Sequence, residues 1–111
     1  MINSTHIEWK ELIEKDPDAV IIDCRTASEW NQGIIEGSLL LDLLNPQRFM
    51  YEAEKLNKEK NYYIYCRSGI RSVTACQILD SSGVKNTYNL IGGLMNWQEK
   101  LVAPVTLRNA I

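Results

Sequence analysis

The sequence predicts an α/β fold with a mostly parallel central sheet of about five strands and helices on both faces. Short apolar runs alternate with segments of helical periodicity, which is the pattern of repeated strand–helix–strand units. These runs are continuously apolar, as expected for strands that are covered on both faces of a sheet. The chain of 111 residues fits one domain and leaves little room for two, so residues 1–111 are expected to form a single domain.

The first half of the chain predicts a helix followed by two strands. Thr5 and Glu8 have the spacing of a capping box, and apolar residues follow them at helical spacing. Asp16-Pro17 ends this helix, because the residue before a proline avoids the helical region. The apolar runs at residues 19–22 and 38–43 are both predicted to be strands.

The second half continues the alternation. Asn45-Pro46 resembles an N-cap followed by proline at the first helical position. Residues 62–65 are aromatic and β-branched, which favours a strand, and residues 70–82 predict a helix with an apolar stripe. Residues 87–91 predict a last strand, after which Gly92-Gly93 turns the chain into a short helix.

Composition excludes several classes of partner and cofactor. The formal charge of −2 comes from 12 basic and 14 acidic residues, so nucleic acid and anionic membranes are not expected partners. No apolar run could span a bilayer, and the N-terminus does not resemble a signal peptide. Three cysteines without regular spacing favour a reducing, cytoplasmic location. With His6 as the single histidine, no metal site is expected.

The segment Cys66-Arg67-Ser68-Gly69-Ile70-Arg71-Ser72 has the features of a nucleophile loop. It follows a predicted strand and leads into a predicted helix, at the sheet edge where parallel α/β folds place their sites. Converging backbone N–H groups and the helix dipole favour a thiolate, and cysteines so placed have pKa values of roughly 3.5–7.5. Gly69 allows a tight turn, while Arg71 and Arg67 add positive charge. We expect a small cup with an exposed anionic sulfur, suited to thiosulfate or a phosphate ester.

This loop resembles the active-site loop of rhodanese-type sulfurtransferases. Three further segments resemble that family in the same order: Asp23-Cys24-Arg25 with Glu29-Trp30, residues 33–38, and residues 89–93 with Trp97. Two positions depart from the family pattern. Ile34 replaces a common histidine, and Cys24 replaces a common aliphatic residue.

The resemblance implies a rhodanese-like fold and a two-step exchange. Cys66 would be the catalytic nucleophile, taking a sulfane sulfur from thiosulfate or a persulfide donor and holding it as a persulfide. A thiophilic acceptor such as cyanide, a small thiol or a protein thiol would then remove the sulfur. No metal or organic cofactor is implied. The residues that would bind the substrate are Arg67, Ser68, Gly69, Ile70, Arg71 and Ser72.

Several of these residues also have a structural interpretation. Asp23, Arg25 and Glu29 are expected to support the end of a strand through ion pairs rather than to act in catalysis. Arg71 either contacts an anion or braces the loop. Cys24 is either a core residue or a thiol that resolves a persulfide.

Two alternative functions remain open at this point. Phosphatases of the same fold place five residues between cysteine and arginine, whereas four separate Cys66 from Arg71 here, which favours the smaller sulfur. The second alternative is a module that passes its persulfide to one protein partner, or an inactive adaptor. An inactive adaptor is disfavoured because Cys66 is present.

Overall fold

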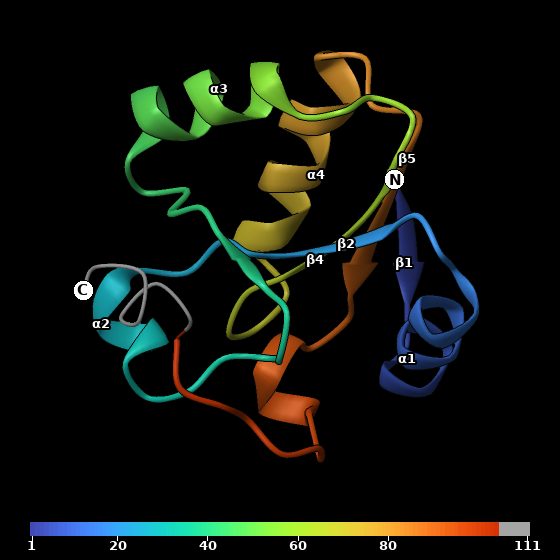
Figure 1. Cartoon of the computed structure of the whole chain (residues 1–111). Helices are drawn as coiled ribbons and strands as arrows, with labels where there is room; N and C mark the ends of the chain where they lie inside the picture. The colour runs from blue at the N-terminus through green and yellow to red at the C-terminus, as the bar shows by residue number, and fades with distance from the viewer. Residues whose placement is uncertain (105–111) are drawn as a thin grey trace.

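Five parallel strands form the central sheet in the order β1-β5-β4-β2-β3 (Figure 1). The computed structural model describes residues 1–104, so the predicted domain of residues 1–111 extends beyond the described residues. The strands are β1 (Ile2–Ser4), β2 (Ala19–Asp23), β3 (Leu39–Leu40), β4 (Asn61–Tyr65) and β5 (Asn86–Leu90). The predicted α/β class and the parallel sheet are confirmed.

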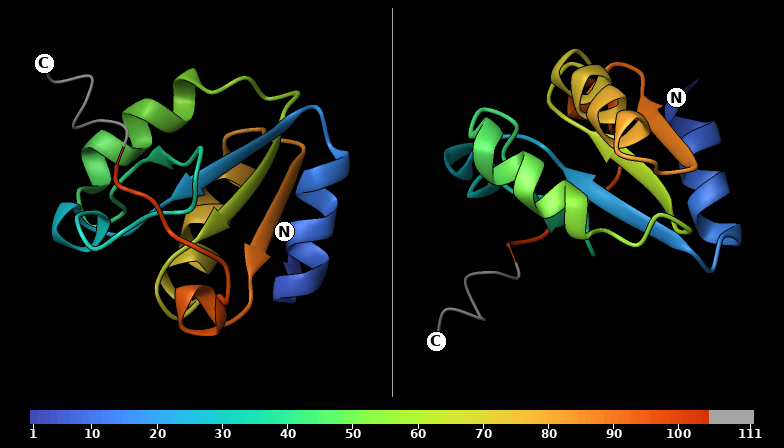
Figure 2. Two further views of the ribbon diagram at one scale, coloured as in Figure 1. Left: turned by 60° about the horizontal axis from the view of Figure 1, so that its bottom comes forward. Right: turned by 90° about the horizontal axis from the view of Figure 1, so that it is seen from above.

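Helices cover both faces of this sheet (Figures 1 and 2). They are α1 (His6–Lys15), α2 (Ala27–Trp30), α3 (Pro46–Lys55), α4 (Arg71–Ser81) and the 3-10 helix η1 (Gly93–Asn96). The α3 and α4 helices pack over one face, around Ile22, Phe49 and Ile64. The α1 helix packs over the other face, where Trp9 contacts Tyr63 and Tyr65 edge to face. No helix among residues 1–104 combines the length and apolar character needed to cross a bilayer.

Side-chain alternation in β4 determines which face receives the candidate nucleophile. Tyr62 and Ile64 point towards α3 and α4, whereas Tyr63 and Tyr65 point towards α1. The next residue in this alternation is Cys66, which belongs to the apolar cluster beneath α3 and α4. The sulfur therefore lies under the helix that begins at Arg71.

Two helix boundaries follow the sequence signals. The capping box of α1 is present, with Thr5 Oγ1 accepting the Glu8 N–H at 3.3 Å and Glu8 Oε1 accepting the Thr5 N–H at 2.9 Å. The α3 helix begins at Pro46, as predicted, although the Asn45 side chain makes no capping hydrogen bond.

The strand predicted at residues 38–43 is wrong in its length. Only Leu39–Leu40 pair with β2, because this edge strand meets the last two residues of β2 and the chain then turns towards α3. The three-residue strand β1 and the one-turn helix α2 were not predicted, since neither is long enough to show a periodic pattern.

The segment after α2 is held in place by two contacts. Ile34, where the family pattern has histidine, is fully buried and exchanges two backbone hydrogen bonds of 2.8 Å with Val102. The fully buried Tyr65 hydroxyl accepts the Ile35 N–H at 3.0 Å and lies 2.9 Å from Ser38 Oγ. The Tyr65 hydroxyl thereby ties this segment to the strand that leads into the cysteine loop.

Replacing Tyr65 with phenylalanine should lower the free energy of unfolding by about 1–3 kcal/mol, because the buried Ile35 N–H loses its acceptor. Urea unfolding measures the effect. The matched control is Tyr51→Phe, because Tyr51 is 60% exposed and its hydroxyl can bond to water. Equal stability of the Tyr65→Phe protein and the control would show that this hydrogen bond contributes nothing.

Candidate active site

Cys66 lies directly between the end of β4 and the loop that leads into α4. Its Sγ accepts the Gly69 N–H at 3.0 Å and lies 3.4 Å from Ser72 Oγ. The expectation of donors facing the sulfur is met by these groups, but the expectation of an exposed sulfur is wrong, since Cys66 is fully buried. The sulfur therefore lies beneath the surface rather than in an open cup.

The 3-10 helix η1 is bonded to the backbone of this loop. Leu94 donates its N–H to the Cys66 carbonyl and Met95 donates its N–H to the Arg67 carbonyl, both at 3.0 Å. Gly93 allows this approach, because a Cβ there would collide with the Cys66 carbonyl oxygen. Gly69 has φ +92°, and a Cβ there would lie 2.9 Å from the Gly92 nitrogen. Both positions therefore require glycine.

The pKa of Cys66 is lowered to about 4 by a hydrogen bond from the Cys24 thiol, against the opposing effect of burial, with further help from Ser72 and Gly69. The same contact and burial raise the pKa of Cys24. A single negative charge therefore belongs to Cys66. Cys24 Sγ faces the Tyr65 carbonyl at 3.4 Å, which favours a thiol because a carbonyl can only accept.

A chain of polar side chains lies behind the sulfur, and only Ser72 among them was predicted as part of the site. Ser72 Oγ is bonded to Asn89 Oδ1, and Asn89 Nδ2 donates to Asn3 Oδ1 at 3.0 Å. With this amide orientation the one proton of Ser72 goes to Asn89 rather than to Cys66. An asparagine at the centre of a predicted buried strand was the sequence signal for this chain.

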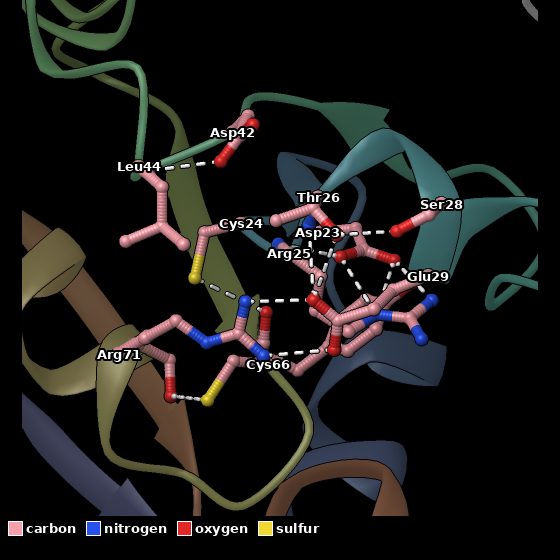
Figure 3. Close-up of polar contacts among 12 residues, drawn as sticks. Asp23, Cys24, Arg25, Thr26, Ser28, Glu29, Asp42, Leu44, Cys66 and Arg71 are labelled. Atoms are coloured by element: carbon pink, nitrogen blue, oxygen red, sulfur yellow. Dashed lines mark hydrogen bonds and ion pairs between the residues drawn. The ribbon is translucent and has the colours of Figure 1, made fainter.

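Arg71 is paired with Glu29 rather than directed at the sulfur. Its two terminal nitrogens donate to the two Glu29 oxygens, each at 2.8 Å, and so join α4 to α2 (Figure 3). Hydrogen bonds from Arg71 hold the pKa of Glu29 at about 2. Glu29 also accepts the Thr26 N–H at 3.2 Å, at the start of its own helix. Of the two roles expected for Arg71, contact with an anion or bracing of the loop, this ion pair corresponds to bracing.

Asp23 and Arg25 form a second, more deeply buried ion pair at the end of β2. Arg25 Nη2 lies 2.7 Å from Asp23 Oδ2 and also donates to the Gly33 carbonyl at 2.8 Å. Both side chains are almost completely buried. The pair connects the end of β2 to the segment that follows α2.

A polar cleft of about 450 Å³ lies beside the loop. Its lining residues are Arg25, Glu29, Gln32, Gly33, Arg67, Leu94, Met95 and Leu101. Arg67 has no ion-pair partner within residues 1–104, so its charge is available to an anion in the cleft. Cys66 does not line this cleft. Ser68 and Ile70, also predicted to bind substrate, are exposed at the tip of the loop.

Comparison with known proteins identifies the family. The model of the rhodanese-like domain matches residues 5–100. A putative sulfurtransferase of Bacillus subtilis, YtwF, is 38% identical over 89 residues, covering 80% of this chain and 82% of that protein. The thiosulfate sulfurtransferase GlpE of Coxiella burnetii is 36% identical, covering 85% and 84%. The crystal structure of a Staphylococcus aureus rhodanese-like domain protein has a TM-score of 0.81 and 28% identity, covering 94% and 99%.

The chain therefore belongs to the rhodanese-like domain family, whose members include proteins named as sulfurtransferases. A tRNA uridine(34) hydroxylase of Pelagibacter ubique is also similar, at 33% identity over 96% of this chain. The chain spans only 36% of that longer protein.

Replacing Cys24 with alanine should raise the pKa of Cys66, because the thiolate loses its strongest hydrogen-bond donor. The thiolate absorbance measured against pH should rise near pH 4 in the wild-type protein and at higher pH in Cys24→Ala. Cys24→Ser is the matched control, since its hydroxyl keeps a donor at the same place and should keep the pKa of Cys66 low. An unchanged titration in the alanine variant would disprove the role assigned to this thiol.

Replacing Glu29 with glutamine should lower the free energy of unfolding by about 1–2 kcal/mol at neutral pH, because Arg71 loses a partner that is three-quarters buried. The pKa of Glu29 is lowered from 4.5 to about 2, so the pair stabilises the fold above the ordinary carboxyl pKa. The difference from wild type should shrink as pH falls from about 4.5 to 2.

The control for this prediction is Glu52→Gln. Glu52 lies 3.6 Å from Arg48, which is 73% exposed, so its loss should change stability by less than about 0.5 kcal/mol. A difference for Glu29→Gln that stays constant over this pH range in urea unfolding would contradict the assignment.

Proposed function

We propose that the chain is a sulfurtransferase that carries a sulfane sulfur as a persulfide on Cys66. The donor is thiosulfate or a persulfide, and the acceptor is cyanide, a small thiol or a protein thiol. One observation supports the proposal above the others. A cysteine beneath a helix start accepts a backbone N–H, and its pKa is lowered to about 4, so it is a thiolate at neutral pH.

The first half-reaction needs no group beyond the loop and the donor. The Cys66 thiolate attacks the outer sulfur of thiosulfate, a sulfur–sulfur bond forms, and the bond to the sulfonate sulfur breaks. Sulfite leaves with the bonding electron pair, and the transferred sulfur remains as an anionic persulfide. The Gly69 N–H points at Cys66 Sγ and can donate to this anion.

Access to the sulfur requires the loop to move. Because Cys66 is fully buried, a donor cannot reach Sγ without a local movement of the residues around it. Ile70 at the tip of this loop is 75% exposed, so its displacement uncovers little apolar surface. Arg67 places a positive charge on the adjoining cleft, where it would attract an anionic donor.

The phosphatase alternative is disfavoured by the ion pair of Arg71. A phosphate ester needs a guanidinium that faces the nucleophile, whereas both terminal nitrogens of Arg71 are bonded to Glu29.

The side chains around the loop are compatible with transfer of the sulfur to a thiol of a partner protein. Ile70 and Met95 are 75% and 67% exposed there and offer apolar contacts to a docking partner.

Mixing the reduced protein with thiosulfate should release one sulfite per chain and add the mass of one sulfur atom. Intact mass spectrometry at the earliest time after mixing measures the addition, and cyanide should then remove it as thiocyanate. Cys66→Ala should show neither event, because the nucleophile is absent.

Cys76→Ala is the matched control, because Cys76 is buried in α4 and should leave the addition unchanged. If the wild-type protein releases no sulfite and gains no mass with thiosulfate or with a small-molecule persulfide, the proposed function is wrong.

A further inference from the structure

Cys24 and Cys66 occupy equivalent positions at the ends of two neighbouring strands. The register pairs Asp23 of β2 with Tyr65 of β4, and each cysteine is the next residue. The Cys24 N–H donates to the Tyr65 carbonyl at 3.1 Å, so the ladder of β2 and β4 continues to this level. Figure 3 shows the two side chains coming from these adjacent strand ends.

Both side chains point to the same face of the sheet. Side chains alternate along a strand, and Cys24 is two residues after Ile22 just as Cys66 is two residues after Ile64. All four belong to the apolar cluster beneath α3 and α4. Both cysteines are fully buried, so the group that Cys24 can react with is internal.

The backbone spacing fits a disulfide between these two residues. Neighbouring strands lie about 4.8 Å apart, and natural disulfides join Cα atoms that are about 4.4–6.8 Å apart. A bond between Cys24 and Cys66 therefore requires side-chain rotation and no rearrangement of the sheet. Cys76, the other cysteine of the cluster, lies on α4 instead of on a strand end.

We propose that Cys24 is the resolving thiol of the Cys66 persulfide and gives the chain a second activity, the release of the carried sulfur as hydrosulfide. This inference rests on the proposed function, because it requires the persulfide to form. It identifies an acceptor within the chain itself, in addition to any external thiophile.

The step balances without an external oxidant. The sulfur of Cys24 attacks the inner sulfur of the persulfide, and a bond forms between Cys24 Sγ and Cys66 Sγ. The outer sulfur leaves with the bonding electron pair, takes the proton of Cys24 and departs as hydrosulfide. The sulfane sulfur is reduced and the two cysteines are oxidised to a disulfide, which two electrons from an external thiol or dithiol then reopen.

The experiment follows the fate of a loaded persulfide in the absence of oxygen. Protein is loaded with thiosulfate and freed from it by rapid desalting, and intact mass and hydrosulfide are then measured over time. Wild-type protein should lose the added sulfur, release an equal amount of hydrosulfide and end two hydrogen masses below the reduced chain. Peptide mapping without reductant should link the peptides that contain Cys24 and Cys66.

Cys24→Ser should load sulfur and retain it at least tenfold longer, because its hydroxyl keeps a hydrogen-bond donor but cannot form the disulfide. Cys24→Val serves as a second variant in case the serine disturbs the core, and because it also removes the donor to Cys66, it is compared by the lifetime of the loaded persulfide and not by the rate of loading. Cys76→Ala should behave as the wild type does.

Equal persulfide lifetimes in the wild-type protein and both Cys24 variants would overturn this inference and leave the proposed function intact. Retention of sulfur in Cys76→Ala would also overturn it, by assigning resolution to the wrong cysteine. If no protein in the series gains the mass of one sulfur from thiosulfate or from a small-molecule persulfide, the proposed function itself fails.

Discussion

The parallel pairing of β2 with β4 is the constraint on which the site depends. Five consecutive residue pairs fix the register of these strands, and a shift by one residue would turn every following side chain to the opposite face. This register brings the buried ion pair of Asp23 and Arg25, the Cys24 thiol and the Cys66 sulfur to one edge of the sheet. The α4 helix begins directly beyond that edge, so its first turn supplies Ser72 to the same sulfur.

Burial and charge oppose one another at Cys66, and hydrogen bonds decide the outcome. Removing a thiolate from water favours the neutral thiol, yet the pKa of Cys66 is lowered to about 4. The donors that reverse the effect of burial come from three separate parts of the chain: Cys24, Gly69 and Ser72. A buried anion held in this way is protected from water while it keeps a nucleophilic sulfur ready for a donor.

Much of this arrangement could be predicted from the sequence, because it is encoded locally. The capping box at Thr5, the start of α3 at Pro46 and the turn at Gly69 each depend on residues that are close in the chain. The missed features depend on distant partners. The burial of Cys66 results from its packing beneath α3 and α4, and the orientation of Arg71, which the sequence left open between two roles, results from Glu29, which is 42 positions away. Residue type alone could not distinguish a guanidinium that faces the sulfur from one that faces a carboxylate.

The contacts of η1 and of Glu29 with the cysteine loop limit which part of the loop can move. On one side η1 is bonded to the carbonyls of Cys66 and Arg67, and on the other side Glu29 holds the first residue of α4. Both contacts fix the ends of the loop, while Ser68 and Ile70 between them are exposed. A movement confined to residues 68–70 would therefore leave both braces and Cys24 in place. The thiol that lowers the pKa of Cys66 thus remains beside the sulfur throughout such an opening, which is the position that resolution of a persulfide requires.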